Sequence, residues 1–483
     1  MTGVSDVDAV VVGAGPNGLA AAIVLAGAGL AVRVYEAAGT IGGGARTAEL
    51  TLPGFRHDVC SAVHPMAIAS PFFRAFDLGA HGVEMRTPEV SYAHPLDGGR
   101  AGIAWHDLDR TTDGLGVDGA AWRALLGPLR DAWPDVVALG MSDFRRLPRA
   151  PVTAARFGAR VLEQGSPLWG RRFHDQVAPA MITGVAAHAI TPPRSPAPAG
   201  VALLLGALAH AGGWPVPRGG SQSIVDALTA ELVRRGGSVI TGHRVASLDE
   251  LPPARAVLLD VTPGALARMA GDRLPAGYLR ALRRFRHGAA ACKVDFALSG
   301  PVPWTVPECA PAGTLHLGGS RAEIVTAERD VLAGRHSERP FVLASQPHVV
   351  DDSRGGHTLW TYAHVPNGST VDMTEAVTAR IEAFAPGFRD LVLASNVITA
   401  AEASTHNANY VGGDIAAGAI SLRQTVFRPT VRWNPYATPI PGVYLCSSST
   451  PPGPGVHGMC GVHAAARALR TRFGVRTDPL ELV

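Results

Sequence analysis

Cysteine is scarce in this chain. Only five of the 483 residues are cysteines, at positions Cys60, Cys292, Cys309, Cys446 and Cys460. No two of them form a CxxC pair, so the chain lacks both the dithiol redox motif and the usual spacing of a zinc site. Few, widely spaced cysteines are typical of a protein that stays in the reducing cytoplasm. We therefore predict a cytoplasmic protein without a metal site.

Charge is scarce as well. Charged residues make up 17% of the chain, the formal net charge is only +3, and the 43 basic residues are scattered. No basic stripe is present, so we expect no nucleic-acid partner. Hydrophobic residues make up 47%, which is typical of a well-buried globular enzyme. The length predicts two domains or one interleaved pair.

One long uncharged stretch resembles a membrane segment but does not fit one. Residues 9–32 carry no charge, which is long enough to cross a bilayer. The glycine-rich letters GAGPNG break the run, no basic segment precedes it, and it leads into the strand-like VRVYE. Neither a membrane span nor a signal peptide has this pattern, so we predict no transmembrane segment.

The stretch VDAVVVGAGPNGLAAAIVLAGAGLAVRVYE, residues 7–36, predicts a strand, a glycine turn, a helix and a second strand. The letters AVVV are apolar throughout, as in a parallel strand that is buried on both faces. Gly13 permits the tight turn, Gly15 lets the backbone approach a pyrophosphate, and Gly18 allows the helix to pack closely on the strand. The helix N-terminus then faces the phosphates. This unit is predicted to bind a dinucleotide.

An acidic residue completes the unit. Glu36 stands 18 residues after Gly18, where a carboxylate accepts hydrogen bonds from both ribose hydroxyls and repels a 2′-phosphate. Two other segments match the glycine pattern. GLGVDG, residues 114–119, follows the charged WHDLDRTTD and is interpreted as a helix cap, and GPGVHG, residues 453–458, belongs to a loop. A single dinucleotide site is therefore predicted.

The next segment favours a flavin over a nicotinamide. AAGTIGGGARTAEL places three glycines, residues 42–44, and Arg46 where an NAD domain ordinarily continues into another helix. The glycines can bring backbone donors close to a ligand. Arg46 can add a cation to the pyrophosphate or lie beside the flavin ring. The alternative is a flexible surface loop with a solvated arginine.

These segments together resemble the FAD fingerprint of the phytoene-desaturase-like branch of the amine oxidase superfamily. The resemblance continues in LPGFRHDVCSAVHP (52–65), PRGGSQSIVDALTAELVRRGGSVITGHRV (217–245), NYVGGDIAAGA (409–419) and PGVYLCSSSTPPGPGVHGMCGVHAAARAL (441–469). It covers most of the chain and implies a resident FAD.

The resemblance also implies which residues contact FAD. They are Gly13, Gly15, Pro16, Asn17, Gly18, Glu36, Gly43, Gly44, Arg46, Thr47, Val245, Ser447, Ser448, Gly455, Val456, His457 and Gly458. Ser447 and Ser448 would contact the pyrophosphate or the ribityl chain, and residues 455–461 would pass beneath the isoalloxazine. Related flavoproteins often have an acid near Ser448, so hydroxyls there depart from the family pattern. Cys460 suggests a covalent flavin thioether, although a small residue beside the ring explains it as well.

The predicted fold class is α/β: an FAD-binding Rossmann-like domain of the glutathione-reductase type, interleaved with a substrate domain. We expect the FAD-binding domain to comprise residues 1–100, 215–280 and 425–483. The insert 101–214 contains segments with helical spacing and predicts a helical cap. The insert 281–424 contains ACKVDFALSG, PFVLASQPHVV and TLWTYAHVP, which predict an antiparallel sheet.

The 18 histidines supply the candidates for catalysis. His457 in the closing motif is favoured, followed by His64 after the early glycine loop and His406 before the GGD stretch. A buried histidine that only satisfies hydrogen bonds is the alternative for each.

The predicted function is FAD-dependent dehydrogenation, or desaturation, of a hydrophobic small molecule by hydride transfer to flavin N5, with oxygen or a quinone as electron acceptor. Desaturation is preferred because the resemblance favours it and the substrate segments contain few acids to bind an amine. An amine oxidase and a redox-neutral isomerase are the alternatives among enzymes. A partner-binding protein of the same fold, like the Rab escort and GDP-dissociation inhibitor proteins, is the non-enzymatic alternative. The substrate and the oligomeric state stay open.

Overall fold

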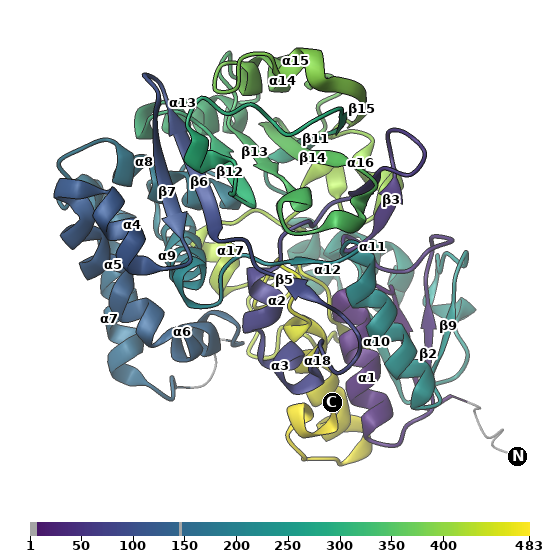
Figure 1. Ribbon diagram of the computed structural model, residues 1–483. Helices are drawn as coiled ribbons and strands as arrows, with labels where there is room; N and C mark the ends of the chain where they lie inside the picture. The colour runs from purple at the N-terminus through teal and green to yellow at the C-terminus, as the bar shows by residue number, and fades with distance from the viewer. Residues whose placement is uncertain (1–6, 144–146) are drawn as a thin grey trace, which may run out of the picture.

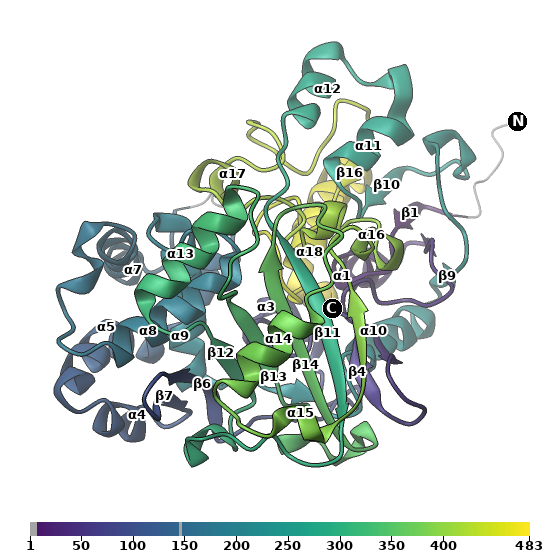
Figure 2. The same cartoon turned by 90° about the horizontal axis from the view of Figure 1, so that it is seen from above.

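Two large β-sheets, two short strand pairs and a group of helices make up the computed structural model, which describes residues 7–143 and 147–483. In Figure 1 the sheet drawn in green lies above the purple and yellow segments, and the blue helices form the left side. Figure 2 shows the same helices beside the green sheet from above. The purple and yellow segments, which come from the first and last parts of the described chain, thus lie side by side.

The first sheet is parallel and lies where the dinucleotide unit was predicted. Its strand order is β16-β10-β1-β2-β9. The strands are β1 (Ala9–Val12), β2 (Val32–Tyr35), β9 (Ser238–Ile240), β10 (Ala256–Leu259) and β16 (Val443–Leu445). Ala9 of β1 pairs in parallel with Ala256 and with Val32, which places β1 in the centre. The three FAD-binding segments predicted from the sequence each contribute to this sheet.

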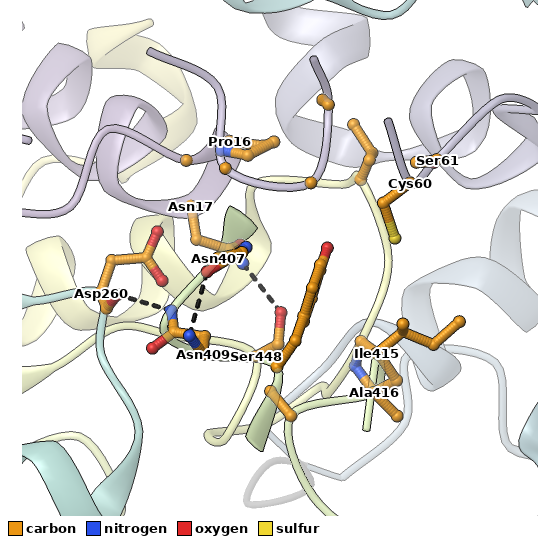
Figure 3. Close-up of a pocket in the computed structure, with 18 of the residues that line it drawn as sticks. Pro16, Asn17, Cys60, Ser61, Asp260, Asn407, Asn409, Ile415, Ala416 and Ser448 are labelled. Atoms are coloured by element: carbon orange, nitrogen blue, oxygen red, sulfur yellow. Dashed lines mark hydrogen bonds between the residues drawn. The ribbon is translucent and has the colours of Figure 1, made fainter. Parts of the chain in front are cut away.

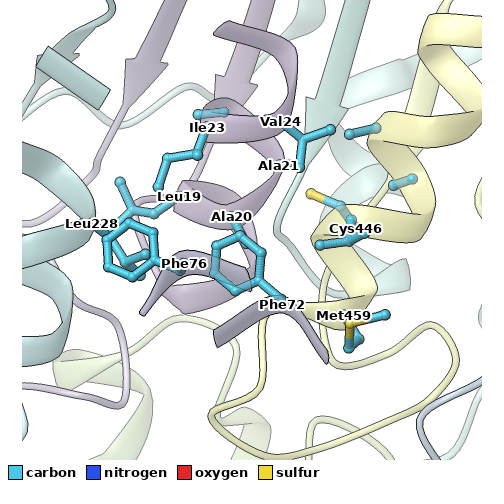
Figure 4. Packing of buried hydrophobic residues seen from close by; sticks show 14 of the residues in the cluster. Leu19, Ala20, Ala21, Ile23, Val24, Phe72, Phe76, Leu228, Cys446 and Met459 are labelled. Atoms are coloured by element: carbon cyan, nitrogen blue, oxygen red, sulfur yellow. The ribbon is translucent and has the colours of Figure 1, made fainter. Parts of the chain in front are cut away.

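Helices cover both faces of the parallel sheet. On one face lie α1 (Pro16–Gly27), α10 (Gln222–Arg234) and α18 (Met459–Ala468). Figure 4 shows Leu19 and Ala20 of α1 packed against Phe72 and Phe76, with Met459 of α18 alongside. On the other face α11 (Pro263–Ala270) and α12 (Ala276–Arg283) pack on the strands. Because both faces are covered, the strands are apolar throughout.

The second sheet has seven strands in the order β15-β11-β14-β13-β12-β6-β7. Its strands are β6 (Val90–Leu96), β7 (Arg100–Trp105), β11 (Ala290–Leu298), β12 (Thr314–Leu317), β13 (Val342–Ser345), β14 (His357–Val365) and β15 (Val392–Ile398). The pairs are antiparallel, as predicted, except that β6 and β12 run parallel.

The place of β6 corrects the predicted boundary at residue 100. Residues 1–100 were assigned to the FAD-binding segment, yet Val90–Leu96 lies inside the seven-stranded sheet. All seven residues of this strand are buried because both faces of the sheet are covered here: Val90 and Ala93 belong to one apolar layer, and Tyr92 packs with the helical insert on the other face. Such a fully buried strand has no polar alternation to show which sheet it joins.

The two faces of the seven-stranded sheet differ in chemistry because side chains alternate along each strand. On β14, Leu359 and Ala363 belong to the apolar layer that includes α14 (Thr374–Glu382) and α15 (Phe388–Leu391). Trp360 and Tyr362, one position away from each, face the opposite side and line a cavity. One face of the sheet therefore forms a core, and the other forms part of the site.

The insert predicted as a helical cap is helical after its first strand. Its α-helices are α4 (Leu108–Gly114), α5 (Gly119–Asp131), α6 (Trp133–Gly140), α7 (Pro151–Gln164), α8 (Val177–Ala186) and α9 (Pro196–Ala211). Buried Trp122, Leu126 and Met181 hold them together. GLGVDG joins α4 to α5 as the predicted cap, and a Cβ on Gly119 would lie 2.1 Å from the Thr112 carbonyl oxygen. Within the described ranges, no helix is long and apolar enough to cross a membrane.

Four short strands and one further helix complete the surroundings of the site. The strands form two pairs, β3 (Thr47–Glu49) with β4 (Arg56–Asp58) and β5 (Met85–Arg86) with β8 (Val216–Pro217). Helix α13 (Arg321–Leu332) follows β12 directly.

Candidate functional site

A cavity of about 780 Å³ extends from the glycine turn to the seven-stranded sheet. We call its two ends the turn end and the sheet end. The turn end is lined by Gly13, Gly15, Pro16, Glu36, Thr40, Arg46, Arg244, Val245, Asp260 and Arg268. The sheet end is lined by His188, Ile190, Val201, Leu204, Leu205, Trp214, Thr314, Leu343, Trp360 and Tyr362. Between them lie residues from 60–66, 405–420, 448 and 454–456.

The glycine turn has the backbone that the sequence predicts. Gly13 has φ +104°, a conformation that glycine adopts without strain. A Cβ on Gly18 would lie 2.0 Å from the Gly13 carbonyl oxygen, so only glycine lets α1 begin this close to β1. Gly18 itself lies outside the cavity lining, which fits its predicted packing role rather than direct contact.

Glu36 lies at the end of β2 and lines the turn end. Its carboxylate accepts hydrogen bonds from the backbone N–H groups of Ala14 and Ala38, each at 2.8 Å. These bonds fix the carboxylate beside the turn while leaving it in the cavity wall. Val245, from the loop after β9, lines the same end. Contact of Glu36 with the ribose and of Val245 with FAD stays a prediction.

Asp260 was not predicted as a site residue from the sequence. It directly follows β10 and lines the turn end of the cavity. Its Oδ2 accepts a hydrogen bond from the Gly18 backbone N–H at 3.1 Å. Burial raises the pKa of Asp260 to about 7, and the charge of Glu36 adds to the rise. The side-chain amide of Asn409 donates to the Asp260 carbonyl oxygen at 2.9 Å, as Figure 3 shows. The only sequence signal was an acid after the apolar strand letters AVLL.

The side chain of Arg46 stabilises the loop of residues 42–47 through hydrogen bonds. Gly43 and Gly44 line the cavity, and Arg46 donates from Nε to the Gly43 carbonyl oxygen at 2.9 Å. The Arg46 guanidinium also donates to the His406 carbonyl oxygen. Thr47 lies outside the lining, because its hydroxyl donates to Asp58 and accepts from the Gln222 backbone. The predicted surface-loop alternative therefore does not describe Arg46.

The closing loop enters the cavity with only part of its predicted residues. Ser448 lines the cavity, and its hydroxyl accepts from the Asn17 amide at 3.3 Å, a contact drawn in Figure 3. Gly455 and Val456 also line it. Ser447 does not, because its hydroxyl donates to the Val261 carbonyl oxygen at 2.7 Å. The sequence motif located the loop but not the direction of its side chains.

His457 and Gly458 lie outside the cavity lining as well. Gly458 has φ +70° and precedes α18, where a Cβ would lie 2.7 Å from Phe72. Nδ1 of His457 accepts from the Met459 backbone N–H at 3.0 Å, so its Nε2 donates to the Gly453 carbonyl oxygen at 3.1 Å. Burial lowers the pKa of His457 to about 4. This position supports a structural role and not the catalytic role that we favoured.

The other two catalytic candidates do line the cavity. His64 is buried, and its Nε2 lies 2.7 Å from the Ser221 hydroxyl. That hydroxyl donates to the Ser61 carbonyl oxygen, so Nε2 of His64 carries the proton and Nδ1 is an acceptor. Burial lowers the pKa of His64 to about 4. His406 is placed by the bond from Arg46 to its carbonyl oxygen, and burial lowers its pKa too.

A buried charge cluster supports the sheet next to the cavity. Lys293, the only lysine of the chain, forms an ion pair with Asp295 on β11. Arg354 pairs with Asp58 at 2.9 Å and with Asp351 at 2.6 Å, and all three side chains are buried. Each charge has a partner, as burial requires.

The turn end fits FAD on structural grounds. The first turn of α1 opens into the cavity, and Gly15 and Gly43 keep its wall free of side chains. A Cβ on Gly43 would lie 3.2 Å from Cα of Gly15, which shows how close the two backbones come. Asn17 also keeps a buried amide oxygen without a partner among the described residues. A helix N-terminus between two glycine backbones is a typical pyrophosphate site.

The chain sequence matches the family described as flavin containing amine oxidoreductase over residues 17–468. The chain belongs to this family. It is 27% identical to the rat protein named pyridine nucleotide-disulfide oxidoreductase domain-containing protein 2, over 95% of this chain and 92% of the rat protein. The protein is thus an FAD-dependent oxidoreductase, and the predicted superfamily and cofactor are confirmed.

Solved structures share the fold. An engineered putrescine oxidase matches with a TM-score of 0.60 at 17% identity, covering 95% of this chain and 97% of the oxidase. A reduced UDP-galactopyranose mutase matches with a TM-score of 0.55 at 13% identity, covering 98% and 95%. The predicted fold class is confirmed.

Proposed function

We propose that this oxidoreductase removes two hydrogen atoms from a C–C bond of an uncharged, largely apolar substrate. The observation that carries the proposal is the placement of charge in the cavity. Among the described lining residues, the acids are Glu36 and Asp260, and both lie at the turn end. The sheet end is lined by aliphatic and aromatic side chains with His188 and Thr314. A cationic amine there would be buried without a counter-charge, which costs several kcal/mol.

The chain and the cofactor have separate tasks in this reaction. FAD, when bound, supplies the two-electron acceptor that takes a hydride from the substrate carbon. Pro16 and Glu36 at the turn end would hold it, together with Ser448 and Gly455, which line the cavity between its two ends. The sheet end would align the apolar substrate and exclude water.

His64 is the residue that we propose to accept the proton. The hydride leaves one carbon and a proton leaves its neighbour, so a base is needed as the C=C bond forms. Nδ1 of His64 is unprotonated, and it has no partner in the part of the chain that the structure describes. With its pKa lowered to about 4, His64 is in the accepting form at neutral pH.

Oxygen or a quinone is the proposed final electron acceptor. One strand-turn-helix unit with a terminal acid lies in the parallel sheet, and one dinucleotide occupies such a unit. The acceptor would therefore be a compound other than a bound nicotinamide.

The proposal is tested by identifying a retained ligand. The purified protein is expected to be yellow and to release FAD on denaturation, and organic extraction followed by mass spectrometry gives the candidate substrate. Added anaerobically, that compound should bleach the flavin band and lose two hydrogen atoms. Ammonia release would instead identify an amine oxidase, and a product of unchanged mass an isomerase. A colourless protein that does not bind added FAD would contradict the cofactor itself.

A further inference from the structure

The sheet end of the cavity contains polar hydrogen-bond donors without partners. Nε1 of Trp360 and the hydroxyl of Thr314 are buried, and neither has a partner among the described residues. Both residues line the cavity. Thr314 on β12 and Trp360 on β14 each pair with Ser345 of the intervening β13, so their side chains lie on the same face of the sheet. An unpaired buried donor is unfavourable, so such groups are typical of a site that a ligand completes.

His188 lies opposite these strands, in the turn that follows α8, and it lines the same end. Its Nε2 is 2.9 Å from Nε2 of His316 on β12. Burial lowers the pKa of His188 to about 3 and that of His316 well below its ordinary value, so both rings are neutral. One of the two nitrogens must therefore donate the shared proton to the other.

The surroundings of His316 decide which ring donates. His316 is fully buried, and its Nδ1 has no partner in the described ranges. A Cβ on Gly184 of α8 would lie 3.0 Å from this Nδ1 and 2.7 Å from Nδ1 of His94. Both Nδ1 atoms thus face the Cα of a glycine. An unprotonated nitrogen can accept a weak C–H hydrogen bond there, whereas a protonated Nδ1 would have no acceptor for its N–H. The His316 proton is consequently on Nε2.

The tautomer of His188 follows. Because His316 donates, Nε2 of His188 accepts, and the single proton of the neutral His188 ring is on Nδ1. His188 therefore offers the cavity a fixed, uncharged N–H donor.

The backbone beside His188 is strained, which supports a functional role. Ile190 has φ +45° and ψ +51°, a left-handed conformation that is rare for a β-branched residue. It lines the cavity two positions after His188. Strain of this kind is concentrated at ligand sites, where the surrounding structure maintains it.

We propose that His188 Nδ1, Trp360 Nε1 and the Thr314 hydroxyl form a neutral donor set that binds an uncharged carbonyl oxygen of the substrate, as in a ketone, ester or amide. This inference rests on the proposed function and narrows its substrate class. A carboxylate is disfavoured because none of the described residues that line the sheet end is a cation, and a pure hydrocarbon would leave all three donors unpaired. A hydrogen-bonded carbonyl also acidifies the C–H beside it, which is the proton that desaturation removes.

The test compares two probes of equal chain length, 2-undecanone and undecane, titrated into the FAD-loaded enzyme under anaerobic conditions. Binding is followed by the shift of the flavin absorption band. We expect the ketone to bind at least about tenfold more tightly than the alkane, the effect of one or more well-placed hydrogen bonds. Undecylamine should bind no better than the alkane.

Two variants assign the effect to named donors. His188→Leu and Trp360→Phe should each reduce the preference for the ketone severalfold, His188→Gln should restore part of it through its amide N–H, and the exposed control His81→Leu should not change it. If His188→Leu fails to fold, Trp360→Phe and the wild-type comparison still decide. Equal binding of ketone and alkane, an unchanged preference in both variants, or tightest binding of the amine would overturn the inference. FAD content, measured before each titration, identifies loss of the cofactor, and loss of two hydrogen atoms from the extracted compound tests the proposed function independently of these outcomes.

Discussion

The carboxylate of Asp260, the residue that follows strand β10, caps helix α1 by accepting a hydrogen bond from the Gly18 backbone N–H at 3.1 Å. Gly18 is the third residue of α1, the position whose N–H a capping side chain usually satisfies. The N-cap residue itself is Gly15, which has no side chain to do so. The cap therefore comes from Asp260, the residue that follows β10, while Gly15 contributes only backbone to the cavity wall.

Replacing Asp260 by alanine should destabilise the protein and weaken FAD binding. Loss of a helix cap costs about 1 kcal/mol. Asp260→Asn keeps an acceptor oxygen for the Gly18 N–H, so its loss should be smaller. Urea unfolding and FAD titration measure the two effects. Equal stability of Asp260→Ala and the wild type would show that the cap contributes nothing.

Asp260 should also make stability depend on pH. Its folded pKa, about 7, is raised above the ordinary value of 3.8, so the folded state favours the protonated form. The protonated Asp260 side chain contributes its full stabilisation of the folded state below about pH 4, and this contribution is lost as the pH rises through 7. Asp260→Asn has no titrating carboxyl and does not lose stability in this way. The free energy of unfolding of the variant, relative to that of the wild type, should therefore rise by about 1 kcal/mol between pH 5 and pH 8. This value is smaller than the full pKa shift implies, because the carboxyl lines a solvent-accessible cavity. A constant difference between variant and wild type would refute the assignment.

Glu36→Gln should weaken FAD binding while leaving the fold intact. The amide keeps one acceptor for the backbone N–H groups but loses the charge that strengthens hydrogen bonds from ribose hydroxyls, so we expect a loss of about 1–2 kcal/mol. Glu49→Gln, an exposed acid on β3, is the matched control. Unchanged affinity in a titration monitored by flavin fluorescence would remove Glu36 from the ribose site.

NADH and NADPH should not reduce the bound flavin. The enzyme is mixed anaerobically with an excess of either nucleotide, and the flavin band is followed over time. Within residues 7–143 and 147–483, one strand-turn-helix unit with a terminal acid borders the cavity, and such a unit binds one dinucleotide, so the band should persist. Rapid bleaching by either nucleotide would reveal a second nucleotide site.

His457 and His64 should respond differently to removal. His457→Ala breaks two buried hydrogen bonds and leaves a cavity, so it should lower the free energy of unfolding by about 2–4 kcal/mol, with little change in the reduction rate per bound FAD. His64→Ala should slow flavin reduction by the identified substrate, by about 10²-fold or more, if it accepts the proton. Stopped-flow reduction and urea unfolding on both variants separate the roles. Slow flavin reduction in His457→Ala together with an unchanged rate in His64→Ala would instead support His457 as the catalytic residue.

Features that depend on residues close together in the sequence were predictable, and features that depend on the tertiary structure were not. The turn at Gly13 was predictable because the glycines, the apolar strand and Glu36 are close in the sequence and each has one physical reason. The roles of Thr47, Ser447 and His457 were not, because a motif locates a loop but does not fix the direction of each side chain. The structure turns these three toward Asp58, Val261 and Gly453.

The sheet end was beyond sequence reasoning for a different reason. His188, Thr314 and Trp360 come from three distant segments. The order of the strands brings Thr314 and Trp360 to one sheet, and the packing of α8 against that sheet places His188 beside it. Period-two alternation could have shown that Trp360 and Tyr362 share one face of β14. It could not show that this face borders a cavity rather than a second core.

Gly184 supplies the last prediction, because it lies where α8 meets the two histidines of the seven-stranded sheet. A Cβ at this position would lie 2.7 Å from Nδ1 of His94 and 3.0 Å from Nδ1 of His316, closer than van der Waals contact allows. Both rings are held by bonds on their far side, to the Gly319 carbonyl oxygen and to His188, so neither can retreat freely. Gly184→Ala should therefore destabilise the protein by about 1–3 kcal/mol, although alanine is the better helix former. Gly158→Ala on α7, where a Cβ meets nothing within 4 Å, is the control and should be neutral or stabilising. Urea unfolding of both variants measures the difference, and a Gly184→Ala protein as stable as the control would show that the space behind His316 is not closed.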